Sequence, residues 1–117
     1  MDKELNWKPY QHGASIGAIG SEEGVIVQDD EHAMGARVTL ERRDGKAARF
    51  AITCGVYGWF LHTHYCGSGE EARQDFEGMK LGLDRIADVL SSDGTSPEQR
   101  EHAVLAVISD FVDRYPT

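Results

Sequence analysis

Cysteine is scarce in this sequence, and long apolar runs are absent. The 117 residues include two cysteines, Cys54 and Cys66, whereas small secreted domains are usually rich in disulfides. No stretch approaches the roughly 20 apolar residues of a membrane-spanning helix, and Met1 to Asn6 lack the apolar centre of a signal peptide. We therefore expect a cytoplasmic protein with free thiols and no association with a membrane.

Positive charge is also in short supply. The chain has 12 Lys and Arg against 20 Asp and Glu, a net charge of -8, which argues against nucleic acid or an anionic membrane as a partner. Residues 1–35 and 70–117 are acidic, with net charges of -5 and -6, while residues 36–69 carry +3. A basic centre therefore lies between acidic flanks, in a chain whose length suits a single domain, residues 1–117.

The basic centre shows the alternation of apolar and polar side chains that is typical of half-buried strands. Three successive antiparallel strands are predicted between residues 36 and 66. Arg43-Asp44-Gly45 suits a three-residue hairpin loop with Gly in the left-handed region, which would set Leu40 opposite Ala48. The apolar face of this sheet would carry Val38, Leu40, Phe50, Ile52, Trp59 and Leu61.

The second connection, residues 55–58, is interpreted as a four-residue loop. That length sets Ile52 opposite Leu61, so that apolar side chains again share a face. It also places Cys54 on the apolar face and Cys66 on the opposite face at the far end of the hairpin. A disulfide between the two cysteines is therefore disfavoured.

The segments before these strands are less regular. Residues 1–12 are either an arm that docks by its aromatic side chains or a partly ordered terminus. The glycine-rich residues 13–20 favour a loop or a fifth strand at 14–20 over a phosphate-binding loop, because the GxGxxG spacing is missing. Residues 24–28 form the first firm strand, and residues 29–32 are predicted to be a charged turn without the spacing of a calcium-binding loop.

Two amphipathic helices are predicted after the sheet. The first follows a cap at Ser68 or Gly69 and runs to about Ser91, and the second follows the N-cap Ser96. Their apolar stripes consist of Phe76, Met79, Leu83, Ile86 and Leu90, and of Val104, Val107, Ile108, Phe111 and Tyr115. The expected fold is α+β, a two-layer sandwich in which an antiparallel meander of four or five strands precedes two C-terminal helices on one face.

Residues 62–66 resemble a metal-ligand cluster at first sight. His62 and Cys66 would lie roughly 13 Å apart along an extended strand, too far to share one ion, and His62 with His64 lacks the two further ligands of a structural zinc site. A nucleophile–base pair of Cys66 and His64 is conceivable, but solvent-facing histidines are the simpler interpretation. We predict no metal, no cofactor and no catalytic residue.

The stronger signal is the sheet face opposite the helices. In the predicted registers this face collects Arg37, Thr39, Arg49, Thr53, Phe60, His62 and His64. Like charges so close together repel, so the patch would attract an acidic partner or a bound anion; the alternative is a solvated face that Glu41 partly neutralises. A bulge in residues 55–58 would instead turn both histidines toward the helices.

Two functions remain open from the sequence. The first is a binding or protein-interaction module without enzymatic activity, expected to be a homodimer or to bind another protein. The second is a binder of an anionic small molecule, or an enzyme acting on one, that uses the predicted patch. A pocket over the sheet face would favour the second function, and a flat self-complementary face would favour the first.

Overall fold

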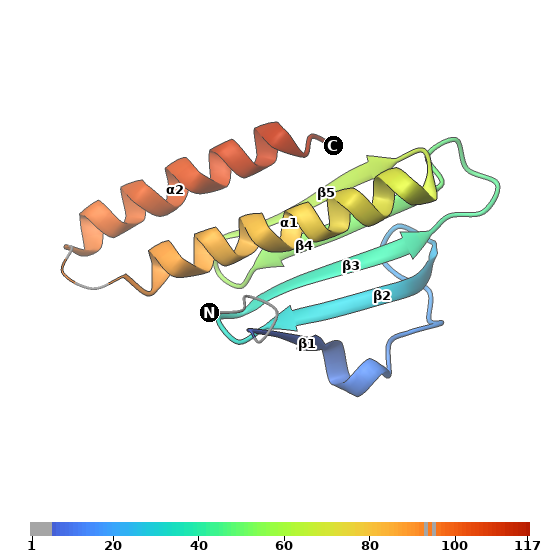
Figure 1. Ribbon diagram of the computed structural model, residues 1–117, viewed down its shortest axis with the longest axis horizontal. Coiled ribbons are helices and arrows are strands. Elements are labelled where there is room, and N and C mark those ends of the chain that lie inside the picture. Colours follow the sequence, from blue (N-terminus) through green and yellow to red (C-terminus); the bar gives the residue numbers. More distant parts are fainter. Residues whose placement is uncertain (1–5, 93, 95) are drawn as a thin grey trace.

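The computed structural model describes residues 6–92, 94 and 96–117. Five strands form one antiparallel sheet in the order β1-β2-β3-β4-β5, and two helices follow it (Figure 1). The elements are β1 (Trp7–Pro9), the short 3-10 helix η2 (Tyr10–Gly13), β2 (Val25–His32), β3 (Ala36–Arg42), β4 (Phe50–Val56), β5 (Phe60–Cys66), α1 (Gly69–Leu90) and α2 (Pro97–Arg114). The predicted α+β meander with two C-terminal helices is confirmed.

Both helices begin at serine caps. The Ser68 hydroxyl accepts the backbone N–H of Glu71 at 3.2 Å, and Ser96 and Gln99 form a reciprocal capping box, which satisfies N–H groups that have no partner inside the helix. In Figure 1, α1 lies across the sheet and α2 runs beside α1. No helix in the described ranges is long and apolar enough to cross a membrane.

The core lies between the sheet and the helices. Its buried members come from β3 to β5, from α1 and, to a smaller extent, from α2: Ala36, Val38, Leu40, Ile52, Cys54, Val56, Cys66, Ala72, Phe76, Met79, Leu83, Ile86, Val104, Ile108 and Phe111. Gly82 lets α2 approach α1, because a Cβ at this position would lie 2.6 Å from Phe111 Cδ2. α1 is therefore the main cover of the sheet, and α2 packs mainly against α1.

The first hairpin keeps its predicted faces although its loop is longer than expected. Leu40 pairs with Ile52 and Val38 with Cys54, so the connection spans residues 43–49 rather than 43–45. The prediction that Leu40 lies opposite Ala48 is wrong. Seven and three are both odd numbers, however, and a shift by an even number of residues leaves each side chain on its predicted face.

The loop of the second hairpin has an odd number of residues, whereas an even number was predicted. Val56 pairs with Phe60, which leaves a loop of three residues, and Ile52 pairs with His64 rather than Leu61. Gly58 takes a φ of +82° in this loop, a conformation that favours glycine. As a result, every side chain of β5 lies on the face opposite to the prediction.

This change of parity moves hydrophobic and polar residues alike. Trp59 and Leu61, predicted in the core, are exposed on the other side of the sheet. Cys66 is buried on the same side as Cys54, and both cysteines are free. The free thiols agree with the prediction, but the placement of the two cysteines on opposite faces was wrong.

Three further differences lie near the N-terminus. The fifth strand is Trp7–Pro9, which pairs with β2, whereas residues 14–20 form turns with one isolated bridge between Ile19 and Val25. Asp29 to His32 continue β2 instead of forming a charged turn. Residues 1–5 of the predicted arm lie outside the described part of the chain.

A buried polar network anchors β1 beside α1. The Nδ1 atom of His32 accepts the backbone N–H of Met34 at 3.0 Å, so Nε2 carries the ring proton and donates it to Asp84 Oδ1 at 2.9 Å. Trp7 donates its indole N–H to the same oxygen at 3.1 Å. Lys80 pairs with Asp30 at 3.1 Å and lies near the Trp7 ring. The network satisfies polar groups that burial would otherwise leave unpaired.

Candidate functional site

The sheet face that points away from α1 is called the open face below. The registers of β2 to β5 place on it Ile26, Asp29, Glu31, Arg37, Thr39, Glu41, Ala51, Thr53, Gly55, Leu61, Thr63 and Tyr65. Three of the predicted site residues, Arg37, Thr39 and Thr53, are therefore together on this face.

The other four predicted site residues lie elsewhere. Arg49 is exposed in the loop before β4, while the Phe60 ring packs on Phe111 at 5.8 Å between centroids. His62 donates to the backbone carbonyl of Tyr115 at 2.6 Å, and His64 also points to the helix side. The seven predicted residues are therefore not brought together by the structure.

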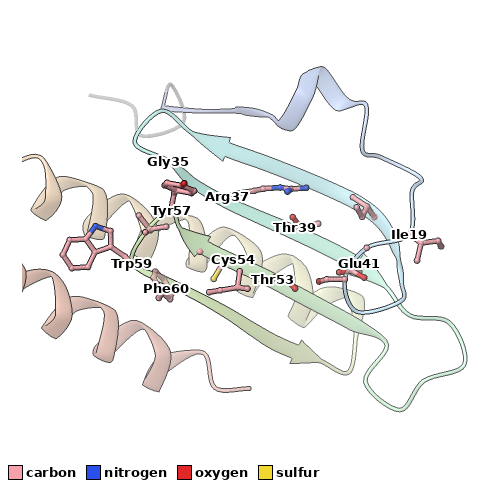
Figure 2. Close-up of a pocket in the computed structure, with 17 residues that line it drawn as sticks. Ile19, Gly35, Arg37, Thr39, Glu41, Thr53, Cys54, Tyr57, Trp59 and Phe60 are labelled. Atoms are coloured by element: carbon pink, nitrogen blue, oxygen red, sulfur yellow. The ribbon is translucent and has the colours of Figure 1, made fainter.

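A cavity of about 780 Å³ lies over the open face (Figure 2). Its floor is formed by residues of β3 and β4, among them Thr39 and Thr53. Figure 2 shows Tyr57 and Trp59 at one end of the cavity, with Ile19 and Glu41 toward the other. This volume falls within the roughly 300–1,000 Å³ that is usual for ligand pockets.

Apolar side chains crowd the rim of this cavity. Tyr57 is 92% exposed, Leu61 80%, Ile19 68% and Trp59 37%, although burial in water-free surroundings would stabilise each of them. Gly55 lines the cavity without a side chain of its own. A Cβ there would lie 2.5 Å from the Phe60 carbonyl oxygen. The four exposed side chains are called the apolar rim.

Asp29 is the centre of a buried polar group on the same face. Its carboxylate accepts two hydrogen bonds from Arg37, at 2.9 and 2.7 Å, one from Thr39 at 3.0 Å and one from Ser15 at 2.7 Å. The hydrogen bond to Asp29 raises the pKa of Arg37 above its ordinary value. The Arg37 guanidinium also stacks on the Tyr10 ring at 3.5 Å, so its charge is used within the chain.

Glu41 holds the glycine-rich segment against the sheet. Its fully buried carboxylate accepts the backbone N–H of Gly24 at 3.0 Å and that of Glu22 at 3.1 Å. A Cβ at Gly20 would overlap this carboxylate, which explains why glycine is needed there. Residues 22–24, which follow the glycine-rich segment, thus bind a carboxylate of their own chain.

Glu22 has a second attachment, to the last strand. The Tyr65 hydroxyl donates to Glu22 Oε1 at 2.5 Å, which raises the pKa of Tyr65. Arg43 Nε donates to the Glu22 carbonyl at 3.1 Å and lies near the Tyr65 ring. These contacts hold in place the residues that directly follow Ile19, Gly20 and Ser21, which line the cavity.

The charge of the open face is the reverse of the expected basic patch. Its charged side chains on β1 to β5 are three carboxylates, Asp29, Glu31 and Glu41, and two basic groups, Arg37 and Lys8, of which Lys8 pairs with Glu31 at 3.7 Å. Two of the basic groups counted in the patch were histidines that lie on the other side. An anion would meet a face with an excess of negative charge.

On the helix side, His64, Cys66, Glu71 and Asp75 form a compact cluster. Their potential ligand atoms all lie within 4.8 Å of one another. His64 Nε2 lies 2.8 Å from Asp75 Oδ2, and the Cys66 thiol donates to the same oxygen at 3.6 Å. Burial and the neighbouring carboxylates raise the pKa of the Cys66 thiol to about 12.

Sequence reasoning missed this cluster although its signal was present. His64 and Cys66 are two residues apart on a strand, and Glu71 and Asp75 are four apart on a helix, so each pair shares a face. The two pairs meet because Gly67 and Ser68 are the whole connection between β5 and α1.

Comparison of the chain with known protein families, curated proteins and solved structures finds no match.

Proposed function

We propose that this protein is a non-enzymatic binding module that holds a partner protein on its open face. The observation that carries the proposal is the apolar rim around the cavity, formed by Ile19, Tyr57, Trp59 and Leu61. Exposed apolar side chains gathered around one hollow are typical of interaction sites, and Trp and Tyr are the residues that most often dominate the binding energy of an interface.

The charges favour a basic partner. The open face has an excess of carboxylates, and the whole chain carries -8, so a basic protein would be attracted and a second copy of this chain repelled. A protruding aromatic or aliphatic side chain of the partner would enter the cavity between Tyr57 and Ile19. A homodimer through the same face is the other outcome of the tests below.

The proposed absence of catalysis rests on the two buried carboxylates of the open face. Asp29 is occupied by Arg37, Thr39 and Ser15, and Glu41 by backbone N–H groups. Carboxylates with their lone pairs engaged in this way position the chain rather than transfer protons. Two free buried cysteines suit a reducing compartment such as the cytoplasm, where we place the protein.

Cross-linking from the apolar rim tests the proposal. A photoreactive amino acid at Tyr57 should capture one basic protein from cells that produce the chain, and the same amino acid at Leu105, which is exposed on α2, should not. The captured protein is then purified. Its dissociation constant should rise at least about tenfold with Leu61→Asp, because the charge would be buried in the interface, and stay within about twofold with Leu105→Asp.

Salt dependence provides a second measurement on the same pair. Affinity for a basic partner should fall as ionic strength rises, since screening weakens attraction between opposite charges. Affinity that is independent of salt, or equally affected by Leu61→Asp and Leu105→Asp, contradicts the proposal. Capture of a second copy of this chain would replace the basic partner with a homodimer.

A small molecule is the second candidate, favoured by the cavity volume of about 780 Å³. The Thr39 and Thr53 hydroxyls at its floor and the apolar rim would suit a mainly apolar molecule with a few hydrogen-bonding groups. Native mass spectrometry of protein isolated from its own cells should then show an added mass. Thr53→Trp, which fills the floor, should abolish that mass, and Leu105→Trp on α2 should leave it unchanged.

A further inference from the structure

Four metal-binding side chains converge on the side of the sheet away from the cavity. The C-terminal end of β5 supplies His64 and Cys66, and the first turns of α1 supply Glu71 and Asp75. His64 and Cys66 are 9% and 1% exposed, while Glu71 is exposed. The cluster is thus buried at its base and open to solvent at the Glu71 side, which leaves a route for an ion to enter.

The partners of the two ring nitrogens of His64 indicate which nitrogen carries a proton. Nδ1 lies 2.6 Å from the backbone carbonyl of Pro116, which can only accept, so Nδ1 carries the ring proton. In the neutral ring the Nε2 lone pair then faces Asp75 Oδ2 at 2.8 Å, and two lone pairs at this distance repel. A proton, carried by either partner, or a metal ion must therefore lie between the two atoms.

We propose that this cluster binds Zn²⁺ through His64 Nε2, Cys66 Sγ and one carboxylate oxygen each of Glu71 and Asp75. Imidazole and thiolate select Zn²⁺ over the hard cations Mg²⁺ and Ca²⁺, which prefer oxygen ligands alone. The Nδ1–H bond to Pro116 is the kind of outer contact that orients a metal-binding histidine. The two carboxylates and the thiolate supply the negative charge that the ion requires.

The distances between the ligand atoms suit Zn²⁺ after small movements of the side chains. Tetrahedral Zn²⁺ with bonds of about 2.0–2.3 Å holds its ligand atoms roughly 3.3–3.8 Å apart. Cys66 Sγ and Asp75 Oδ2 are already 3.6 Å apart. The His64–Asp75 pair, at 2.8 Å, must open, and the exposed Glu71 side chain must turn inward, which its place in the first turn of α1 allows.

Such a site would have a structural role. Four protein ligands complete the coordination of Zn²⁺ and leave no open position for a substrate. The ion would join the end of β5 to the start of α1 and, through the His64–Pro116 hydrogen bond, to the segment after α2. It lies on the opposite side of the sheet from the apolar rim, so it is independent of the proposed function.

Competition with a chromophoric chelator tests the site in the full chain, purified without metal. One equivalent of Zn²⁺ should bind. The substitutions Cys66→Ser and His64→Gln should each raise the dissociation constant for Zn²⁺ by at least about tenfold. Cys54→Ser and Glu70→Gln are the matched controls, because Cys54 is a buried cysteine outside the cluster and Glu70 is the neighbour of Glu71. Both controls, and Leu61→Asp on the open face, should stay within about twofold of the parent.

Cobalt substitution in the parent chain reports the coordination geometry and the thiolate ligand without the need for a variant. Co²⁺ should give the intense visible bands of tetrahedral coordination together with a thiolate-to-cobalt charge-transfer band, and Zn²⁺ should displace it. Glu71→Gln, a surface change that should preserve the fold, should weaken Zn²⁺ binding about tenfold or more. Absence of a charge-transfer band, equal losses with Glu71→Gln and Glu70→Gln, or binding of more than one loosely held ion would overturn the proposal.

Discussion

Arg37 and Asp29 form a two-point ion pair across β2 and β3. Nε and Nη2 of Arg37 donate to the two carboxylate oxygens of Asp29 at 2.9 and 2.7 Å, and the Asp29 side chain is fully buried. The guanidinium that was expected to bind an external anion thus has an anion of its own chain. This pair also brings Tyr10 and Ser15 onto the open face, and so holds the N-terminal segment in place.

Removing this guanidinium should cost stability. Arg37→Ala leaves the buried Asp29 carboxylate with hydroxyl donors alone, and we expect a loss of roughly 1–3 kcal/mol in the free energy of unfolding. Arg42→Ala is the matched control, since its partner Asp44 is exposed, and it should change stability by less than about 0.5 kcal/mol. Urea denaturation measures both, and equal effects would contradict the burial of the pair.

Truncation of a core side chain should be more damaging than truncation of an exposed one. Ile52→Ala and Phe111→Ala each remove buried apolar volume and should each destabilise the protein by roughly 2–5 kcal/mol. Leu105→Ala, at a half-exposed position of α2, should cost less than about 0.5 kcal/mol. Denaturant midpoints for Phe111→Ala that match those of Leu105→Ala would show that α2 does not dock as described.

Alkaline pH should destabilise the fold through Cys54. Burial raises the pKa of its thiol from 9.0 to about 12. Above pH 9 the thiol ionises in the unfolded chain but stays protonated in the folded protein, so stability is present below that pH and is lost as pH rises toward 12. The loss approaches about 1.4 kcal/mol per pH unit.

A comparison with Cys54→Ala isolates this effect. Chemical denaturation at several pH values between about 8 and 10.5 should show a steeper fall for the parent than for the variant, because all other titrating groups are shared. Parallel curves would mean that Cys54 ionises in the folded protein. Thiol titration should in addition find both cysteines free in denaturant.

The length of the loop between β4 and β5 should decide which face of β5 meets the helices. One glycine inserted after Gly58 restores an even loop, so β5 must either turn over or lose its pairing, and Cys66 should become accessible to thiol reagents in metal-free protein. One glycine inserted after Gly45, in the seven-residue loop, should cost only a few tenths of a kcal/mol. Protection of Cys66 in both insertion variants would refute the observed register.

The same loop explains how much could be predicted from sequence. Alternation identified the residues that share a face within β3, β4 and β5, and the stripes of α1 and α2 were clear, because both patterns are local. Which face of β5 turns inward depends on the parity of one loop, and Tyr57 and Trp59 carry no strong turn preference. The predicted even loop pairs Ile52 with the apolar Leu61, whereas the observed odd loop pairs Ile52 with His64. The hydrophobic pattern therefore favoured the wrong parity.

Both the cavity and the metal-binding cluster depend on which face of β5 turns toward the helices. With β5 turned over, His64 and Cys66 face Glu71 and Asp75, and Leu61 joins the cavity. The strand at Trp7–Pro9 was missed because it is short and ends in proline, and its docking relies on a side-chain contact with a distant helix. The role of Gly20 beside the Glu41 carboxylate was likewise invisible without the fold.

The attachment of β1 also bears on the order in which the chain folds. The Trp7–Asp84 hydrogen bond joins positions 77 residues apart, while each hairpin from β2 to β5 closes over a short loop. Closing a long loop costs more entropy than closing a short one, so we expect β1 to join the sheet after the hairpins and α1 have met. A three-residue edge strand that arrives last would also be the first to detach, and amide exchange there should outpace exchange in β3 and β4.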